Sequence, residues 1–204
     1  MGNAGLSRQC GLLAVFGSLL WVVCWEIVSV VGGGSRAERL WRTLLLNPAI
    51  LLIMVGLVGF HRRQARRPGR LSRLGFSVCL LGTATMLLGN VVEFWVSEYF
   101  YGTQTPGWVM MGIGLVMLPG GLFLLGVGTI RAHVFTGWRR GAPLGFGVML
   151  TAAVSLLALS YLSPAALRDG SQLVLAKVSP YAVIYAVAFG WTALGYALWS
   201  EKAA

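Results

Sequence analysis

Two acidic residues, Glu26 and Glu93, lie inside otherwise apolar stretches, and their side chains are the ones most able to do chemistry. An ionisable group inside a membrane is expensive to place there, so it is a functional-site hypothesis by default. Helical spacing puts Asn90 on the same face as Glu93, and we expect Asn47 and Tyr185 at a similar depth on other helices. These five side chains predict an outward-facing polar pocket for a proton, a cation or a small polar solute.

The two carboxylates also have a structural interpretation, which the sequence favours. Neither is expected at the centre of the bilayer, because both fall in the outer third of their apolar stretches. Each could pair with an arginine of segment 32–43, which contains Arg36, Arg39 and Arg42, and so hold two helices together.

The sequence shows no pattern of metal, haem or catalytic residues. The three cysteines form no CxxC pair. His61 and His133 fall beside arginines at helix ends, which makes haem ligation between helices a poor interpretation. There is no Ser-His-Asp set, HExxH motif or phosphate-binding loop. We therefore expect no metal, no cofactor and no enzyme activity.

A proline and two glycines, Pro119, Gly120 and Gly121, fall near the middle of another apolar stretch. Proline removes one helical hydrogen bond, and helix breaks at the membrane midplane mark binding sites in transporters. Proline and glycine are also common in membrane helices, where neighbouring helices satisfy the backbone. The triplet predicts a structural kink, and a hinge if the protein transports a solute.

Long apolar stretches must position these residues. Only 11% of the residues are charged and 57% are hydrophobic, whereas soluble domains carry roughly 25% charged residues. Six stretches are close to the roughly 17–25 residues that a spanning helix needs. They cover about residues 11–31, 44–60, 75–96, 108–130, 144–162 and 180–199. The sequence predicts an all-α, single-domain membrane bundle of six transmembrane helices, with the first stretch retained as a helix.

The connection between the second and third stretches holds six arginines within twelve positions. They are Arg62, Arg63, Arg66, Arg67, Arg70 and Arg73. Because cytoplasmic loops carry an excess of lysine and arginine, this cluster sets the orientation, with both termini in the cytoplasm. The net charge of +10 then reflects topology and attraction to anionic lipid headgroups, so we expect no nucleic-acid partner.

An ungapped offset of 70 residues relates two parts of the chain. Gly56 matches Gly126, Arg70 matches Arg140, and the triplet 74–76 matches the triplet 144–146. Low-complexity membrane sequences match readily by chance, so a parallel duplication of a helical hairpin and coincidence both stay open.

Three segments resemble a broad group of uncharacterised bacterial multi-pass inner-membrane proteins. The segments are GFHRRQARRPGRLSRLGFSVCLLGTATMLLG, GVGTIRAHVFTGWRRGAPLGFGVML and GWTALGYALWSE, and the resemblance covers about residues 55–90, 120–150 and 190–200. It implies an inner-membrane location in a bacterium. The group brings no established activity, so it assigns no functional residue.

The leading functional hypothesis is a non-enzymatic integral membrane protein with a structural, interaction or regulatory role. Its partners are expected to be the lipid bilayer and another membrane protein or a second copy of the chain. The alternative is a small transporter or channel-like protein that uses Glu93, Asn90 and Glu26. A membrane-embedded enzyme acting on lipid is a weaker idea, because no pair of catalytic groups can be named.

Overall fold

The structure, a computed structural model, describes residues 3–31, 40–65, 69–93, 106–162 and 170–200. Six long helices account for most of them, and the described residues contain no strand. The helices are α1 (Asn3–Val31), α3 (Asn47–Gln64), α4 (Arg70–Val91), α5 (Pro106–Ala132), α6 (Ala142–Leu162) and α7 (Gly170–Ser200). A π-helical turn, Arg42–Leu46, leads into α3, and a 3-10 turn, Gly137–Arg140, precedes α6.

All six helices are long and apolar enough to cross a membrane. This confirms the predicted all-α class and the number of spans. Helices suit these sequences because lipid offers no hydrogen bonds, so each segment must satisfy its own backbone. Large apolar side chains also point away from the bundle. Phe16, Leu81, Val116, Leu159 and Phe189 are each between 58% and 68% exposed, as is typical of a lipid-facing surface.

Several helix ends lie beyond the predicted limits. The helix α3 continues through Arg63 to Gln64, and α4 begins at Arg70. Much of the predicted arginine loop is therefore helical, because arginine favours helices and a positive charge suits the carboxyl end of α3. Arg66 and Arg67 lie outside the described residues. The helix α7 begins at Gly170 rather than near Pro180, which lies within it.

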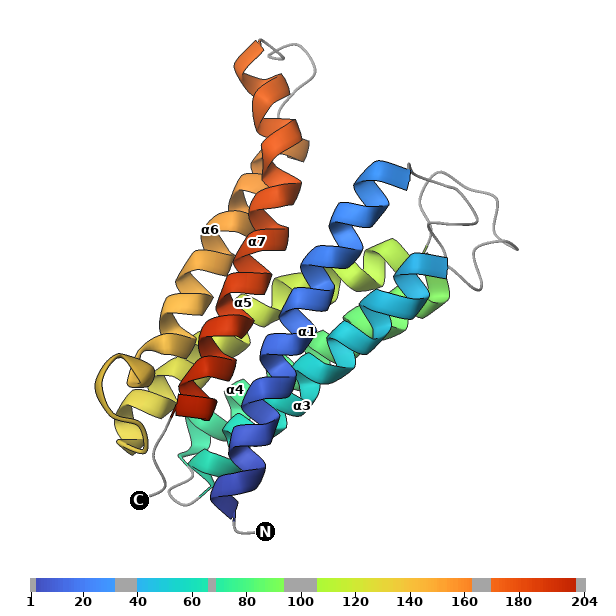
Figure 1. The fold of residues 1–204 in the computed structure, drawn as a ribbon. Coiled ribbons are helices and arrows are strands. Elements are labelled where there is room, and N and C mark those ends of the chain that lie inside the picture. The colour runs from blue at the N-terminus through green and yellow to red at the C-terminus, as the bar shows by residue number, and fades with distance from the viewer. Residues whose placement is uncertain (1–2, 32–39, 66–68, 94–105, 163–169, 201–204) are drawn as a thin grey trace.

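The described ends of the helices gather at two ends of the bundle (Figure 1). At one, which we call the arginine end, α1 begins and α7 ends, and Arg8 Nε donates a hydrogen bond to the carbonyl oxygen of Trp199 at 3.1 Å. The end of α3, the start of α4 and the end of α5 meet there too, through bonds among Gln64, Ser72 and Thr129. At the opposite end, α6 and α7 lean away from α1 and α3 (Figure 1).

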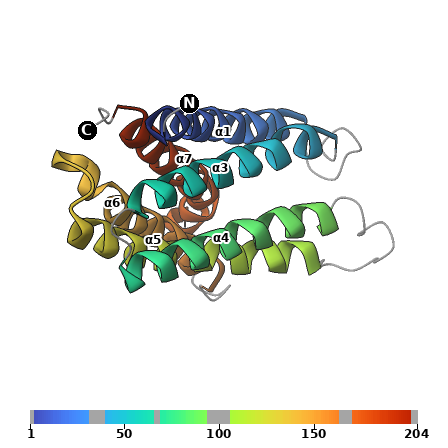
Figure 2. The same ribbon diagram turned by 90° about the horizontal axis from the view of Figure 1, so that it is seen from below.

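The closest helix pair is α4 with α5, which lie side by side along most of their length (Figure 2). Glycines recur every seven residues on both helices, which places each series on one face. The series are Gly75, Gly82 and Gly89 on α4, and Gly107, Gly114, Gly121 and Gly128 on α5. A Cβ atom on Gly114 would lie 2.4 Å from the carbonyl oxygen of Gly82. The two backbones touch, so the pairing needs glycine at these positions.

Two further sets of contacts complete the bundle. The helix α1 packs between α3 and α7, and α6 packs against α5 and α7. Gly11 of α1 and Gly195 of α7 approach each other as closely as the glycines of α4 and α5 do. Phe146 of α6 meets Trp191 of α7 edge to face, with ring centres 5.4 Å apart.

The helix limits bear on the internal repeat. An offset of 70 carries α4 onto residues 140–161, close to the range of α6, and carries α3 onto part of α5. The packing of the two hairpins differs, since α3 and α4 touch less extensively than α5 and α6. Duplication stays a prediction.

Candidate functional site

Asn90 and Asn47, two of the five predicted site residues, bond to each other. The Asn90 amide nitrogen donates to the Asn47 side-chain oxygen at 2.7 Å, which ties the end of α4 to the start of α3. Asn90 is only 1% exposed, and no described residue donates to its side-chain oxygen. A buried amide–amide bond is one of the ways in which membrane helices associate.

Glu93 lies two residues beyond α4 and meets the first turn of α5. Its carboxylate accepts hydrogen bonds from the backbone and the side chain of Trp108. Because the first backbone N–H groups of a helix have no partner within it, a carboxylate there caps α5 and suits its dipole. Glu93 can come this close because Gly107 has no side chain: a Cβ there would lie 2.6 Å from the Cβ of Glu93.

Arg42 supplies the positive charge beside Glu93. Its guanidinium carbon lies 4.4 Å from the ring centre of Trp25 and 4.9 Å from that of Trp108. Cation–π contacts of this kind contribute roughly 0.5–2 kcal/mol each. Arg42 is 4% exposed and Glu93 8% exposed. Burial raises the pKa of the Glu93 carboxyl, and the Trp108 hydrogen bonds and the Arg42 charge oppose that rise without cancelling it.

Glu26 pairs with Tyr185 on the surface of the bundle. The Tyr185 hydroxyl donates to a Glu26 carboxylate oxygen at 2.7 Å and so ties α7 to α1. The structure thus joins Asn47 to Asn90 and Glu26 to Tyr185, and it places Glu93 beside Arg42 and Trp108. None of these five predicted residues lines any of four cavities found among the described residues. The shared polar pocket therefore stays a prediction.

A cavity that the sequence did not reveal lies between the α6–α7 pair and helices α1, α4 and α5. We call it the apolar cavity. Its volume is about 420 Å³, and apolar and aromatic residues of all five helices form its wall. They include Trp25 of α1, Met86 of α4, Gly112 of α5, Tyr161 of α6 and Ile184 of α7.

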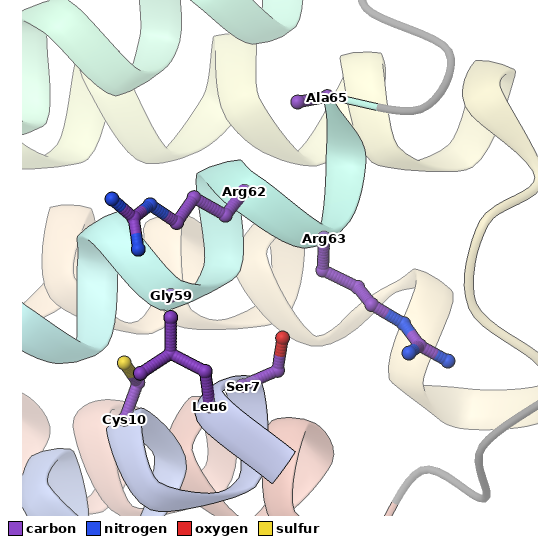
Figure 3. Close-up of a pocket in the computed structure, with 7 residues that line it drawn as sticks. All are labelled: Leu6, Ser7, Cys10, Gly59, Arg62, Arg63 and Ala65. Carbon is purple, nitrogen blue, oxygen red and sulfur yellow. The ribbon is translucent and has the colours of Figure 1, made fainter. Parts of the chain in front are cut away.

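Two basic hollows open at the arginine end. One, of about 380 Å³, lies between α1 and α3, where Ser7 and Cys10 face Gly59 and where Arg62 and Arg63 extend in different directions (Figure 3). The other, of about 560 Å³, includes Arg70, Arg131 and His133 in its wall. Arginines at the end of a membrane-spanning bundle can interact with the anionic headgroups of the membrane surface.

No family model matches the chain, and neither does any curated protein or solved structure.

A buried polar cluster next to the arginine end was also not predicted from the sequence. Ser72 donates to the Gln64 side-chain oxygen, the Gln64 amide donates to Thr129, and Thr129 donates to the carbonyl oxygen of Leu125 at 2.7 Å. All three polar residues are almost fully buried. The sequence placed Gln64 and Ser72 in a loop, so their burial between α3, α4 and α5 was hidden.

The predicted hinge lies inside an unbroken helix. The helix α5 runs from Pro106 to Ala132 through Pro119. Gly121 packs against Cys79 and Gly75 of α4, whereas Gly120 is exposed and a Cβ there would meet no other atom within 4 Å. Motion about Pro119 stays a prediction. Among the described residues there is no group of three or more side chains able to hold a metal ion.

Proposed function

We propose that the chain is a non-enzymatic, multi-pass protein of the bacterial inner membrane that acts through interactions within the bilayer. The observation that carries this proposal is that buried polar side chains of the bundle bond to side chains of other helices. Gln64, Asn90 and Ser18 each bond to a side chain of another helix. Polar groups that associate helices fit a protein whose function lies in its assembled bundle and in what that bundle contacts.

The proposed orientation has both termini in the cytoplasm. It is supported by the gathering of described arginines at the end where α1 begins and α7 ends, since cytoplasmic segments carry the excess of positive charge. These arginines are Arg8, Arg62, Arg63, Arg70, Arg73, Arg131, Arg139 and Arg140. The bacterial inner membrane rests on the resemblance of three segments. The proposed partners are bilayer lipid and another membrane protein or a second copy.

A small transporter or channel is the alternative, and the burial of the Glu93 carboxyl favours it. A buried carboxyl with a raised pKa could take up and release a proton. Against this, Glu93 already caps α5 and lies beside Arg42.

Proton and cation flux into vesicles distinguishes the two proposals. We expect vesicles containing the purified protein to leak no faster than protein-free vesicles, and Glu93→Gln and Glu26→Gln to leave that leak unchanged. A flux above the protein-free level that either substitution abolishes would establish the transporter and overturn the proposal.

A further inference from the structure

The apolar cavity owes its shape to the way α6 diverges from α5. At the arginine end the two helices touch closely: a Cβ on Gly126 would lie 2.6 Å from the backbone of Leu144, and Gly147 approaches Leu122. Toward the opposite end the cavity separates them, with Trp108 and Gly112 of α5 on one side and Tyr161 of α6 on the other. These three wall residues are exposed, so they border the opening.

The other side of the cavity is bridged. The bond between Tyr185 and Glu26 connects α7 to α1, and its two residues directly follow the wall residues Ile184 and Trp25 in the chain. Entry is therefore from the α5–α6 side, which in a spanning helix bundle faces the lipid.

Along the axis of the bundle, the cavity covers the part of one leaflet that is nearest to the headgroups. Its wall begins near the start of α5, at Trp108, and continues to Leu115. Seven residues of helix correspond to roughly 10 Å along the axis. Tryptophan and tyrosine at the mouth are the residues that prefer the headgroup level, so the wall leads from that level toward the hydrocarbon.

The side chains of the cavity wall favour an apolar ligand. A water molecule needs two or more polar partners in a cavity, and these walls are made of tryptophan, methionine, leucine, valine, isoleucine, proline and glycine, with one tyrosine. A volume of about 420 Å³ falls in the range of roughly 300–1,000 Å³ that is common for small-molecule sites. The surroundings of a spanning bundle supply acyl chains at this depth.

We infer that the apolar cavity binds one acyl chain of a phospholipid from the leaflet at the opposite end, which enters sideways between α5 and α6. The inference rests on the membrane location of the chain and is independent of its proposed non-enzymatic role. Glu26 and Tyr185 are the most exposed of the five candidate site residues. The hydrogen bond between them keeps α7 against α1, while the α5–α6 side stays open.

Two glycines of α5 provide a matched pair of variants. Gly112 borders the cavity, Gly120 lies on the same helix away from it, and a Cβ at either position would meet no other atom within 4 Å. Gly112→Phe places a ring at the cavity, and Gly112→Leu places a smaller group there. Gly120→Phe places the same ring on the outside of the helix.

The test uses vesicles of phosphatidylethanolamine and phosphatidylglycerol containing a phosphatidylethanolamine with a diazirine in one acyl chain. After irradiation, labelled residues are mapped by peptide mass spectrometry. We expect label on Met86 and Met111, which line the cavity and are buried. The label there should be lost in Gly112→Phe, reduced in Gly112→Leu and unchanged in Gly120→Phe.

Phe16 of α1 and Phe189 of α7, which are exposed on the outside of the bundle, report on membrane insertion and folding. Their labelling should be equal in all four proteins, and its absence in the wild type would instead contradict the membrane location. Acyl-chain binding is overturned if Phe16 and Phe189 are labelled while Met86 and Met111 are not. It is also overturned if Gly112→Leu and Gly112→Phe, inserted normally, keep the full label on both methionines. Dimer cross-links accompanied by unlabelled methionines would indicate that a second copy fills the cavity.

Discussion

Gln64 shows how much one buried polar side chain does in this bundle. It accepts from Ser72 on α4 and donates to Thr129 on α5, so one side chain of α3 holds three helices. Hydrogen bonds between membrane helices contribute about 0.6 kcal/mol on average and up to about 1.7 kcal/mol. Removing the amide also leaves the Ser72 hydroxyl without its acceptor.

Gln64→Ala is therefore expected to lower the free energy of unfolding by about 1–3 kcal/mol, the usual effect of leaving a buried polar group unpaired. Reversible unfolding in mixed detergent micelles measures this change. Gln9→Ala is the matched control, because Gln9 is an exposed glutamine of α1 near the same end. Equal stability of the two variants would mean that the cluster does not hold the helices.

Arg42 and Glu93 are predicted to depend on each other. Arg42→Gln leaves a buried carboxylate without its neighbouring cation, which should destabilise the protein. Glu93→Gln should be milder, because the pKa of this carboxyl is raised: burial already favours the uncharged form, which glutamine resembles while keeping an acceptor for Trp108. The double variant should recover part of the loss caused by Arg42→Gln.

Unfolding of the two single variants and the double variant forms a cycle that measures this coupling. When two sites do not interact, the changes in unfolding free energy caused by their substitutions add to within about 0.3–0.5 kcal/mol. Additivity within that limit would therefore show that Arg42 and Glu93 are not coupled. The sequence named Arg42 as one of three candidate partners for a carboxylate, and the structure places its charge beside Glu93. The sequence did not show that Glu93 caps α5, because that depends on where α4 ends relative to the start of α5.

Between helices, the glycines of α4 and α5 set the distance. Their seven-residue spacing can be read from the sequence, and small residues on one face of a membrane helix are typical of close helix packing. The partner could not be read, because a small-residue face on one helix fits any similar face. The structure resolves this by placing Gly82 against Gly114 and Gly89 against Gly107.

Gly114→Ala should destabilise the α4–α5 pair, since the new methyl group would lie 2.4 Å from the Gly82 carbonyl oxygen. Overpacking of this kind costs about 1–3 kcal/mol. Gly120→Ala, on the same helix with open space around the new methyl group, should be neutral or stabilising. Unfolding in micelles compares the two, and a Gly114→Ala protein as stable as Gly120→Ala would contradict such close contact.

For the molecule as a whole, the number of spans could be predicted because hydropathy and run length are local properties. Both ends of the arginine segment, up to Gln64 and from Arg70, were wrongly assigned to a loop, since positive charge identifies the side of the membrane better than the end of a helix. The apolar cavity could not be predicted, because its wall combines residues from five helices that are far apart in the sequence. Its existence depends on the divergence of α6 from α5.

The orientation of the bundle is predicted to depend on the six arginines Arg62, Arg63, Arg66, Arg67, Arg70 and Arg73. Single introduced cysteines can measure the orientation. Thr136→Cys lies at the arginine end and Leu40→Cys at the opposite end, and both positions are exposed and outside the spans. The native Cys10, Cys24 and Cys79 are buried and form no disulfide with one another, so they should react slowly with a membrane-impermeant maleimide. The parent protein without an added cysteine is the control for that background.

In intact cells, the maleimide should label Leu40→Cys and not Thr136→Cys. Replacing all six arginines with glutamine removes most of the difference in charge between the two ends, so a fraction of the molecules should insert in reverse and expose Thr136→Cys. Labelling of Thr136→Cys in the protein with all its arginines would reverse the proposed orientation. A labelling pattern that the glutamine replacements leave unchanged would instead show that the remaining charges, such as Arg131, Arg139 and Arg140, are sufficient to hold this end in the cytoplasm.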